Sequence, residues 1–238
     1  MEIAPKDRPF IVAIDGPAGS GKTTTAKALA KELGFIYVDT GAMYRAVALY
    51  AQRSGVSIDD RDGICTLLDD VDIRLERTDG SQHTMLNGED VEKHIRTQEM
   101  SRAASDISAI PCVREAMVDL QRHAAKDAMG AVLEGRDIGT VVFPDSPCKI
   151  YLVADAQTRA ERRKKQLEEK GMSADLDTIR REIEERDRND AAREHSPLRK
   201  ADDAIEVETT NTSIDEQVSM ILSLVRKRID QFQKGQST

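Results

Sequence analysis

The sequence predicts an α/β protein whose helices cover a doubly wound, mainly parallel sheet. Short apolar runs that fit buried strands recur along the chain, and amphipathic helical segments alternate with them. No internal repeat or low-complexity segment interrupts this alternation. The chain has 238 residues, of which 39% are hydrophobic, so it can form one large domain or a core domain with smaller insertions.

The N-terminal quarter predicts two strand–helix pairs. The first apolar run is continuous and fits a strand that is buried on both faces, as in a parallel sheet. A glycine follows the first helix at the position where left-handed backbone is common. The predicted elements are a strand at 10–14, a helix at 22–33 closed by Gly34, a strand at 35–38 and a helix at 42–53.

The middle of the chain changes character and predicts a small inserted subdomain. Residues 71–75 alternate like a half-buried strand, 78–80 predict a turn, and 83–86 predict a second strand that ends at Asn87-Gly88. Further along, we expect helices at 111–125 and 218–229, strands at 131–133, 149–153 and 204–207, and a polar helical stretch at 155–193.

These elements predict how the domains are organised. We assign residues 8–55, 101–154 and 200–230 to a core domain, 56–100 to part of an insertion, 155–195 to a lid and 231–238 to a frayed tail.

Composition excludes several classes of function. The net charge of −8 argues against broad binding to nucleic acid, so an anionic ligand must meet a local group of Arg and Lys side chains. The three cysteines and four histidines lack the spacing of a disulfide framework or a metal site. The N-terminus lacks the features of a signal peptide, and no apolar run approaches the roughly 20 residues of a membrane span. We therefore expect a soluble, cytoplasmic chain.

A glycine-rich loop provides the strongest functional signal. The run Gly16-Pro17-Ala18-Gly19-Ser20-Gly21-Lys22-Thr23 matches G-x-x-x-x-G-K-[ST] and lies between a predicted strand and a predicted helix. In such a loop, backbone N–H groups and the helix N-terminus surround phosphate, and the lysine adds a full charge. The hydroxyl of Thr23 can orient Mg²⁺ directly or through water. The motif predicts a nucleoside triphosphate site but does not identify the reaction.

Two arginines at strand ends suggest a second phosphate site. Arg45 follows the second predicted strand and Arg136 follows the strand at 131–133, so both lie at the sheet edge where ligands collect. Such a pair can clamp the phosphate of an acceptor, although Arg45 alone could equally be a surface helix residue. The N-K-x-D segment of GTPases and the L-S-G-G-Q segment of ABC-type ATPases are both absent. We therefore favour a small-molecule kinase.

The polar stretch at 155–193 has two readings. Its interleaved Arg, Lys and Glu residues are typical of a solvated helix pair joined by ion pairs. Alternatively, it forms a lid that brings guanidinium groups over the transferring phosphoryl group. The lid reading places at least one of Arg159, Arg162 and Arg163 there. Spacing does not decide between them, and we assign Arg162.

Several segments together resemble the bacterial cytidylate kinases. They include D-G-P-A-G-S-G-K-T-T, D-T-G-A-M-Y-R, I-R-T-Q-E, G-R-D-I-G-T-V-V-F-P and I-E-E-R-D-R-N-D, and the likeness runs from about residue 8 to residue 229. The resemblance implies the P-loop NTPase fold, with a five-stranded parallel sheet, a nucleotide-binding insertion and a mobile lid. It also implies ATP-dependent, Mg²⁺-assisted phosphorylation of CMP and dCMP in pyrimidine nucleotide metabolism.

The resemblance also implies roles for individual residues. The loop motif and the lid interpretation assign Gly16–Thr24 to ATP and Lys22, Arg136 and Arg162 to catalysis. The resemblance assigns Thr40, Arg45, Ser105, Arg114, Arg136, Asp137, Arg186, Asp190 and Arg193 to CMP. Among these, Ser105, Arg114 and Asp137 would read the cytosine edge. The acidic surface and the few aromatic residues favour a monomer. The alternatives are a kinase for UMP, AMP or shikimate, and a sensor that holds ATP without transferring it.

Overall fold

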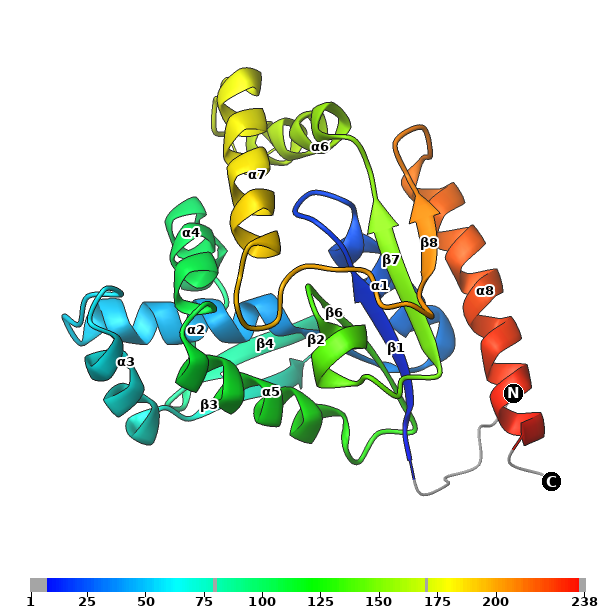
Figure 1. Ribbon diagram of the computed structural model, residues 1–238, viewed down its shortest axis with the longest axis horizontal. Helices are drawn as coiled ribbons and strands as arrows, with labels where there is room; N and C mark the ends of the chain where they lie inside the picture. The colour runs from blue at the N-terminus through cyan, green and yellow to red at the C-terminus, as the bar shows by residue number, and fades with distance from the viewer. Residues whose placement is uncertain (1–7, 79–80, 170, 236–238) are drawn as a thin grey trace. The chain divides into compact units, whose positions relative to one another are not determined.

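The structure is a computed structural model that describes residues 8–78, 81–169 and 171–235. The chain forms two compact units. Unit 1 comprises Met1–Tyr37 and Ala128–Thr238, and unit 2 comprises Val38–Asp127. Unit 1 contains the first strand and the loop motif, whereas unit 2 contains the predicted insertion (Figure 1). Among the described residues, no helix combines the length and the apolar composition that a membrane span requires.

The predicted five-stranded parallel sheet is confirmed. Its strand order is β2-β6-β1-β7-β8, and β1 pairs in parallel with both β6 and β7. All six residues of β1 are buried, which explains why its sequence is a continuous apolar run. The strands are β1 (Phe10–Asp15), β2 (Ile36–Asp39), β6 (Gly130–Gly135), β7 (Cys148–Val153) and β8 (Ile205–Glu208).

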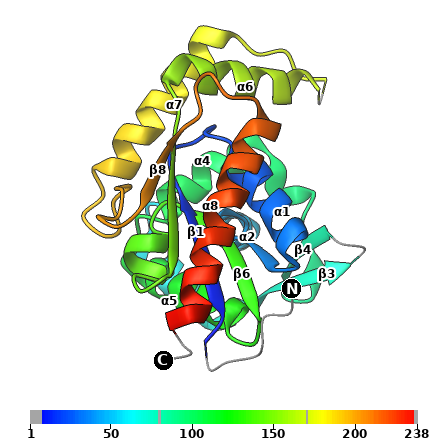
Figure 2. The same ribbon diagram turned by 90° about the vertical axis from the view of Figure 1, so that its right-hand side faces the viewer.

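Two helices pack on one face of this sheet in unit 1. Helix α1 (Lys22–Leu33) and helix α8 (Ile214–Gly235) contact each other and share one apolar cluster with alternate residues of β1 (Figure 2). The predicted bounds of α1 are confirmed, and Gly34 adopts the expected left-handed conformation at φ 66°.

The C-terminal helix is longer than expected. Helix α8 continues to Gly235, whereas the sequence predicted a frayed tail from residue 231. The reason is Phe232, whose ring packs edge-on against Phe10 with 5.3 Å between the centroids. An aromatic contact with the core therefore stabilises the last turns of the helix.

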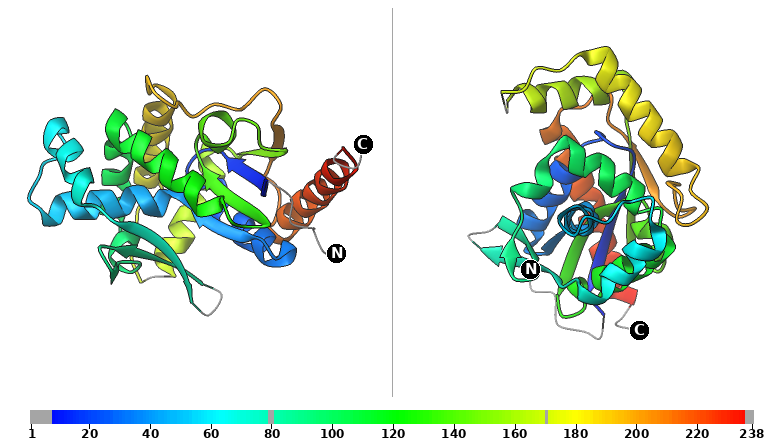
Figure 3. Two further views of the ribbon diagram at one scale, coloured as in Figure 1. Left: turned by 90° about the horizontal axis from the view of Figure 1, so that it is seen from below. Right: turned by 90° about the vertical axis from the view of Figure 1, so that its left-hand side faces the viewer.

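The polar stretch forms two helices, α6 (Ala156–Glu168) and α7 (Leu176–Ala191), which pack together (Figure 3). Each begins at an aspartate whose side chain accepts a backbone hydrogen bond, Asp155 in α6 and Asp175 in α7. Their small core contains Ala160, Leu167, Ile179 and Ile183, which leaves most of their charged residues at least partly exposed.

Unit 2 contains a three-stranded antiparallel sheet in the order β3-β4-β5, which adds a third strand to the two predicted in the insertion. Asn87 and Gly88 both have positive φ, 49° and 83°, which confirms the predicted turn. The predicted turn at 78–80 falls partly outside the described residues. The strands are β3 (Ile73–Thr78), β4 (Ser81–Leu86) and β5 (Glu89–Asp90).

Unit 2 is wider than the predicted segment 56–100, because α2, α4 and α5 belong to the same compact unit. The sequence did not predict α3. This helix has seven residues and a single buried side chain, Ile64, which is too little for a periodic signal. The helices are α2 (Thr40–Arg53), α3 (Arg61–Leu67), α4 (Gln98–Ile107) and α5 (Pro111–Ala125), with short turns η1 (Leu68–Asp70) and η2 (His94–Arg96).

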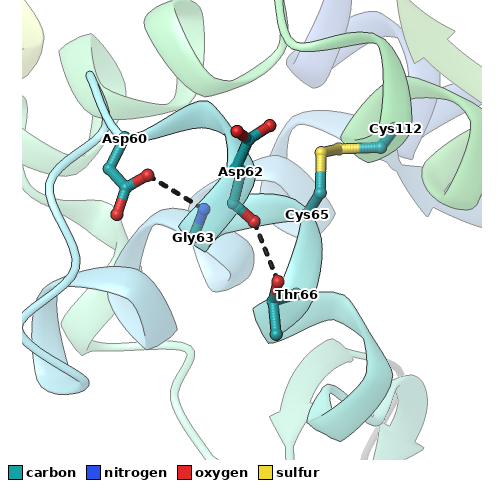
Figure 4. Close-up of a disulfide and its surroundings, with 6 residues drawn as sticks. All are labelled: Asp60, Asp62, Gly63, Cys65, Thr66 and Cys112. Carbon is teal, nitrogen blue, oxygen red and sulfur yellow. Dashed lines mark hydrogen bonds between the residues drawn. A yellow bond between two sulfur atoms is a disulfide. The ribbon is translucent and has the colours of Figure 1, made fainter.

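A disulfide in unit 2 contradicts the expectation drawn from the cysteines. Cys65 of α3 and Cys112 of α5 are bonded, with 5.8 Å between their Cα atoms (Figure 4). They lie 47 residues apart, so sequence spacing gave no sign that the packing of α3 on α5 would bring them together. Cys148 is free, and its burial raises the pKa of its thiol to about 12.

Candidate active site

The glycine-rich loop occupies the turn between β1 and α1 in unit 1. Gly16, Gly19 and Gly21 have φ values of 148°, 78° and 90°, which only glycine adopts readily. At Gly16, a Cβ atom would lie 2.3 Å from the backbone oxygen of Leu152, so β7 excludes every other residue there. These features fix a tight turn whose backbone N–H groups can face an anion at the start of α1.

Lys22 lies at the base of this loop and is only 6% exposed. Its Nζ donates a hydrogen bond to the carbonyl oxygen of Pro17 at 2.6 Å. Burial lowers the pKa of Lys22 well below its usual value, and the charge of Arg136 lowers it further, whereas Glu134 raises it. A bound polyphosphate would counteract these effects, because it places negative charge beside the ammonium group.

Thr23 donates its hydroxyl hydrogen bond to Oε2 of Glu134 at 2.8 Å. Tyr37 donates to Oε1 of the same carboxylate at 2.5 Å. Glu134 is buried near the end of β6, and sequence reasoning did not identify it. Its position directly before Gly135-Arg136 was the available signal. The threonine hydroxyl and this carboxylate thus place two oxygen-bearing side chains beside the loop.

Asp15 joins the loop to the turn after β6. Its Oδ1 accepts from the backbone N–H of Ile138 at 2.9 Å, and its Oδ2 accepts from that of Gly139 at 2.8 Å. The pKa of Asp15 is raised to about 6, chiefly by burial. Asp137, predicted to read cytosine, is buried at the start of η3 (Ile138–Val142) in this turn. Asp15 therefore positions the segment that carries Arg136 and Asp137, a role that sequence reasoning missed.

Three predicted arginines gather around Asp190 of α7. Arg136 Nε lies 2.8 Å from Oδ2, Arg193 pairs with Oδ1, and Arg186 Nε lies 3.9 Å from Oδ2. Burial opposes ionisation of Asp190, but the three guanidinium groups lower its pKa below the usual value. Three guanidinium groups gathered at one carboxylate form a cluster of cations that can meet a phosphate. The structure thus brings together four residues that the sequence assigned to the acceptor.

The lid arginines differ in what they contact. Arg159 is buried, and its Nη1 donates to the carbonyl oxygen of Ala18 in the loop at 3.1 Å and to Asp187 at 2.5 Å. Arg162, assigned to catalysis from the sequence, instead donates to the carbonyl oxygen of Thr209 at 2.5 Å, in the connection from β8 to α8. Arg159 of α6 therefore contacts the phosphate loop in this structure.

The remaining predicted residues lie in unit 2. Thr40 is buried at the start of α2, and Arg45 pairs with Asp39 at 3.1 Å. Arg114 of α5 is buried, donates to the carbonyl oxygen of Ser108 at 3.2 Å, and stacks on the ring of Tyr44 at 5.7 Å. Ser105 lies on α4 and is partly exposed.

A parallel α/β sheet with a phosphate loop at the end of β1 and clustered arginines beside it defines a P-loop phosphotransferase. Comparison with known proteins specifies the family. The family model described as cytidylate kinase matches residues 12–227 of this chain. The chain belongs to the cytidylate kinase family.

Three curated relatives named cytidylate kinase support this membership. The protein of Syntrophotalea carbinolica is 47% identical over 93% of this chain and 94% of its own length. That of Lactobacillus johnsonii is 48% identical over 91% of this chain and 94% of its own length. That of a Geobacter species is 44% identical over 97% of this chain and 98% of its own length.

Proposed function

We propose that the protein transfers the γ-phosphoryl group of ATP to CMP and dCMP, forming CDP and dCDP. Family membership supports the reaction. The observation that carries the proposal is that Lys22 and Arg136, two cations suited to different phosphates, lie close together. Asp15, directly before the loop that holds Lys22, accepts from the backbone N–H groups of Ile138 and Gly139 in the turn that carries Arg136, so a group suited to the acceptor phosphate lies close to a group suited to the donor phosphates.

The transfer requires no protein base. An oxygen of the acceptor phosphate attacks the γ-phosphorus of ATP and forms the new P–O bond. The bond from that phosphorus to the β–γ bridging oxygen breaks, and ADP leaves with the electron pair. A phosphate monoester has a second pKa near ~6, so its attacking oxygen is largely ionised at neutral pH. Lys22 and the arginines around Asp190 position and neutralise the phosphates.

Recognition of the acceptor follows the roles that the family resemblance implies. The resemblance assigns Arg45, Arg136 and Arg193 to its phosphate. Arg186 and Asp190 contact the sugar. Ser105, Arg114 and Asp137 read cytosine, whose amino donor beside two acceptors complements a carboxylate, a hydroxyl and a guanidinium group. The burial of Arg114 and Asp137 supports this role, because polar contacts discriminate best where water is excluded.

The residues present also fit Mg²⁺ bound together with ATP. Glu134 and Thr23 provide oxygen ligands beside the loop, which is the ligand type that Mg²⁺ prefers. Among the described residues there is no group of three or more His, Cys, Asp or Glu side chains that could hold a metal. When bound, Mg²⁺ would neutralise charge on the β- and γ-phosphates.

An acceptor panel tests the proposal. ADP release is measured with ATP and, in turn, CMP, dCMP, UMP, AMP and shikimate, with Lys22→Met as the inactive control. We expect turnover with CMP and dCMP well above the other acceptors, and a loss of several orders of magnitude in the control. ATP binding without turnover on any acceptor would indicate a sensor instead.

The same panel of acceptors tests how the protein recognises the cytosine ring. Asp137→Ala removes the buried carboxylate proposed to accept from the cytosine amino group. We expect the variant to lose preference for CMP over UMP while keeping its affinity for ATP. An unchanged ratio of kcat/KM for the two acceptors would refute this role.

A further inference from the structure

The carboxylate of Asp39 is a hub within unit 2 that sequence reasoning did not identify. Its Oδ2 accepts from Arg45 Nη2 at 3.1 Å and from Arg96 Nη1 at 2.6 Å. Its Oδ1 accepts from the backbone N–H of Ala42 at 2.9 Å and so caps α2. The side chain of Asp39 is only 6% exposed. One buried carboxylate therefore connects Arg45, proposed to bind the acceptor phosphate, with Arg96 of η2.

Arg96 is itself held by the antiparallel part of the unit. Its Nε donates to Oε1 of Glu92 at 2.7 Å, and Oε2 of Glu92 accepts from the hydroxyl of Thr84 at 2.9 Å. Thr84 lies on β4 and is fully buried. Arg96 thus presents one edge to Glu92 and another to Asp39, so its guanidinium plane is fixed from two sides.

This arrangement leaves the Nε atom of Arg45 available to a ligand. Arg45 contacts Asp39 through Nη2, while its Nε is buried and has no hydrogen-bond partner among the described residues. A buried donor without a partner is destabilising, so such a group favours the arrival of an acceptor atom. Because Arg96 shares the negative charge of Asp39, that carboxylate does not fully neutralise Arg45.

We propose that Arg96 and Asp39 are positioning residues that orient Arg45 toward the phosphate of the acceptor nucleotide, an inference that rests on the proposed function. Asp39 fixes the direction of the Arg45 guanidinium group. Arg96 shares the Asp39 carboxylate, so the positive charge of Arg45 is only partly neutralised and can still attract an anion. The inserted segment, through Thr84 and Glu92, holds this pair in place.

The first test compares binding of CMP with binding of cytidine, which lacks the phosphate. We expect Arg96→Met to weaken CMP binding by about tenfold or more, the effect of losing a charge-assisted contact. Cytidine affinity and the KM for ATP should stay unchanged, and Arg96→Lys should restore part of the loss. The matched control is Arg53→Met, because Arg53 also joins α2 to the insertion, through Glu89 at 2.7 Å, without touching Asp39.

The second test is a double-mutant cycle with Arg45→Met. If Arg96 acts through Arg45, Arg96→Met adds no further loss of CMP affinity in the Arg45→Met background. Additive losses, an equal loss for cytidine, or an effect that Arg53→Met reproduces would each overturn the proposal. Thermal unfolding of every variant verifies that it is folded, and Arg96→Lys replaces Arg96→Met in the cycle if the latter is not. Failure of the proposed function itself would show as absence of CMP turnover in the unaltered protein.

Discussion

Asp15 in unit 1 and Asp39 in unit 2 each end a strand of the parallel sheet, and both are buried. Burial raises the pKa of Asp15, the charge of Asp137 adds to this effect, and the result is about 6 despite two backbone N–H donors. Burial also opposes ionisation of Asp39, yet Arg45 and Arg96 lower its pKa to about 2. Both carboxylates are buried, so the two guanidinium groups beside Asp39 account for the opposite direction of its shift.

The two carboxylates therefore contribute to stability in opposite ways. The folded-state pKa of Asp39 is depressed, so its contribution is present above the unfolded value of 3.8 and is lost as pH falls toward 2. The folded-state pKa of Asp15 is raised, so its ionisation is unfavourable to the folded state. Stability falls as pH rises from about 4 through 6.

We expect the largest loss of folding stability when the Asp39 carboxylate is removed. Asp39→Ala leaves two guanidinium groups without their shared counter-ion and removes the cap of α2. Removing one partner of a buried ion pair costs about 3–5 kcal/mol. Urea unfolding at pH 7 measures the loss, and unaltered stability would show that Asp39 is not the hub described.

The next effect concerns covalent support in unit 2. The Cys65–Cys112 disulfide joins two residues that are 47 positions apart in the sequence. By lowering the chain entropy of the unfolded state, a bond across this separation is expected to stabilise the fold by about 4 kcal/mol. Unfolding with and without reductant measures it, and Cys65→Ser serves as a control that should not respond to reductant. A reductant effect of the same size in Cys65→Ser would place the sensitivity elsewhere.

We expect the smallest of the three changes in stability when Asp15 is replaced, and this change tests its raised pKa. In the Asp15→Asn variant the side chain cannot ionise. The variant therefore avoids the decrease of about 3 kcal/mol in the free energy of unfolding that corresponds to the rise in the pKa of Asp15 to about 6. We expect the stability of the variant relative to the unaltered protein to increase by up to that amount between pH 4 and pH 7. A flat difference across this range would contradict the raised pKa.

Local sequence signals predicted most of the fold. The apolar run before Gly16 and the glycines of the loop are dictated by backbone geometry and burial, and both lie within one short segment. The structure also confirmed the Asn87-Gly88 turn and the bounds of α1 and α5. Such features depend on neighbours in sequence, which a single chain displays directly.

What the sequence did not reveal depends on partners far apart along the chain. Glu134 meets Thr23 across 111 residues, and Arg96 meets Asp39 across 57. Arg159 and Arg162 lie one helical turn apart on α6, so spacing alone could not tell which contacts the loop. The family resemblance supplied roles for Ser105 and Arg114 that no local pattern indicates.

The buried ammonium group of Lys22 has a consequence for ligand binding across the pH range. Since its pKa lies well below that of an exposed lysine, the empty loop releases this proton at a lower pH. Nucleotide association then draws a proton from the buffer at any pH at which the nucleotide-free protein has released it. Heats of binding should accordingly vary with the ionisation enthalpy of the buffer, and affinity for the triphosphate should decline before any surface lysine begins to titrate.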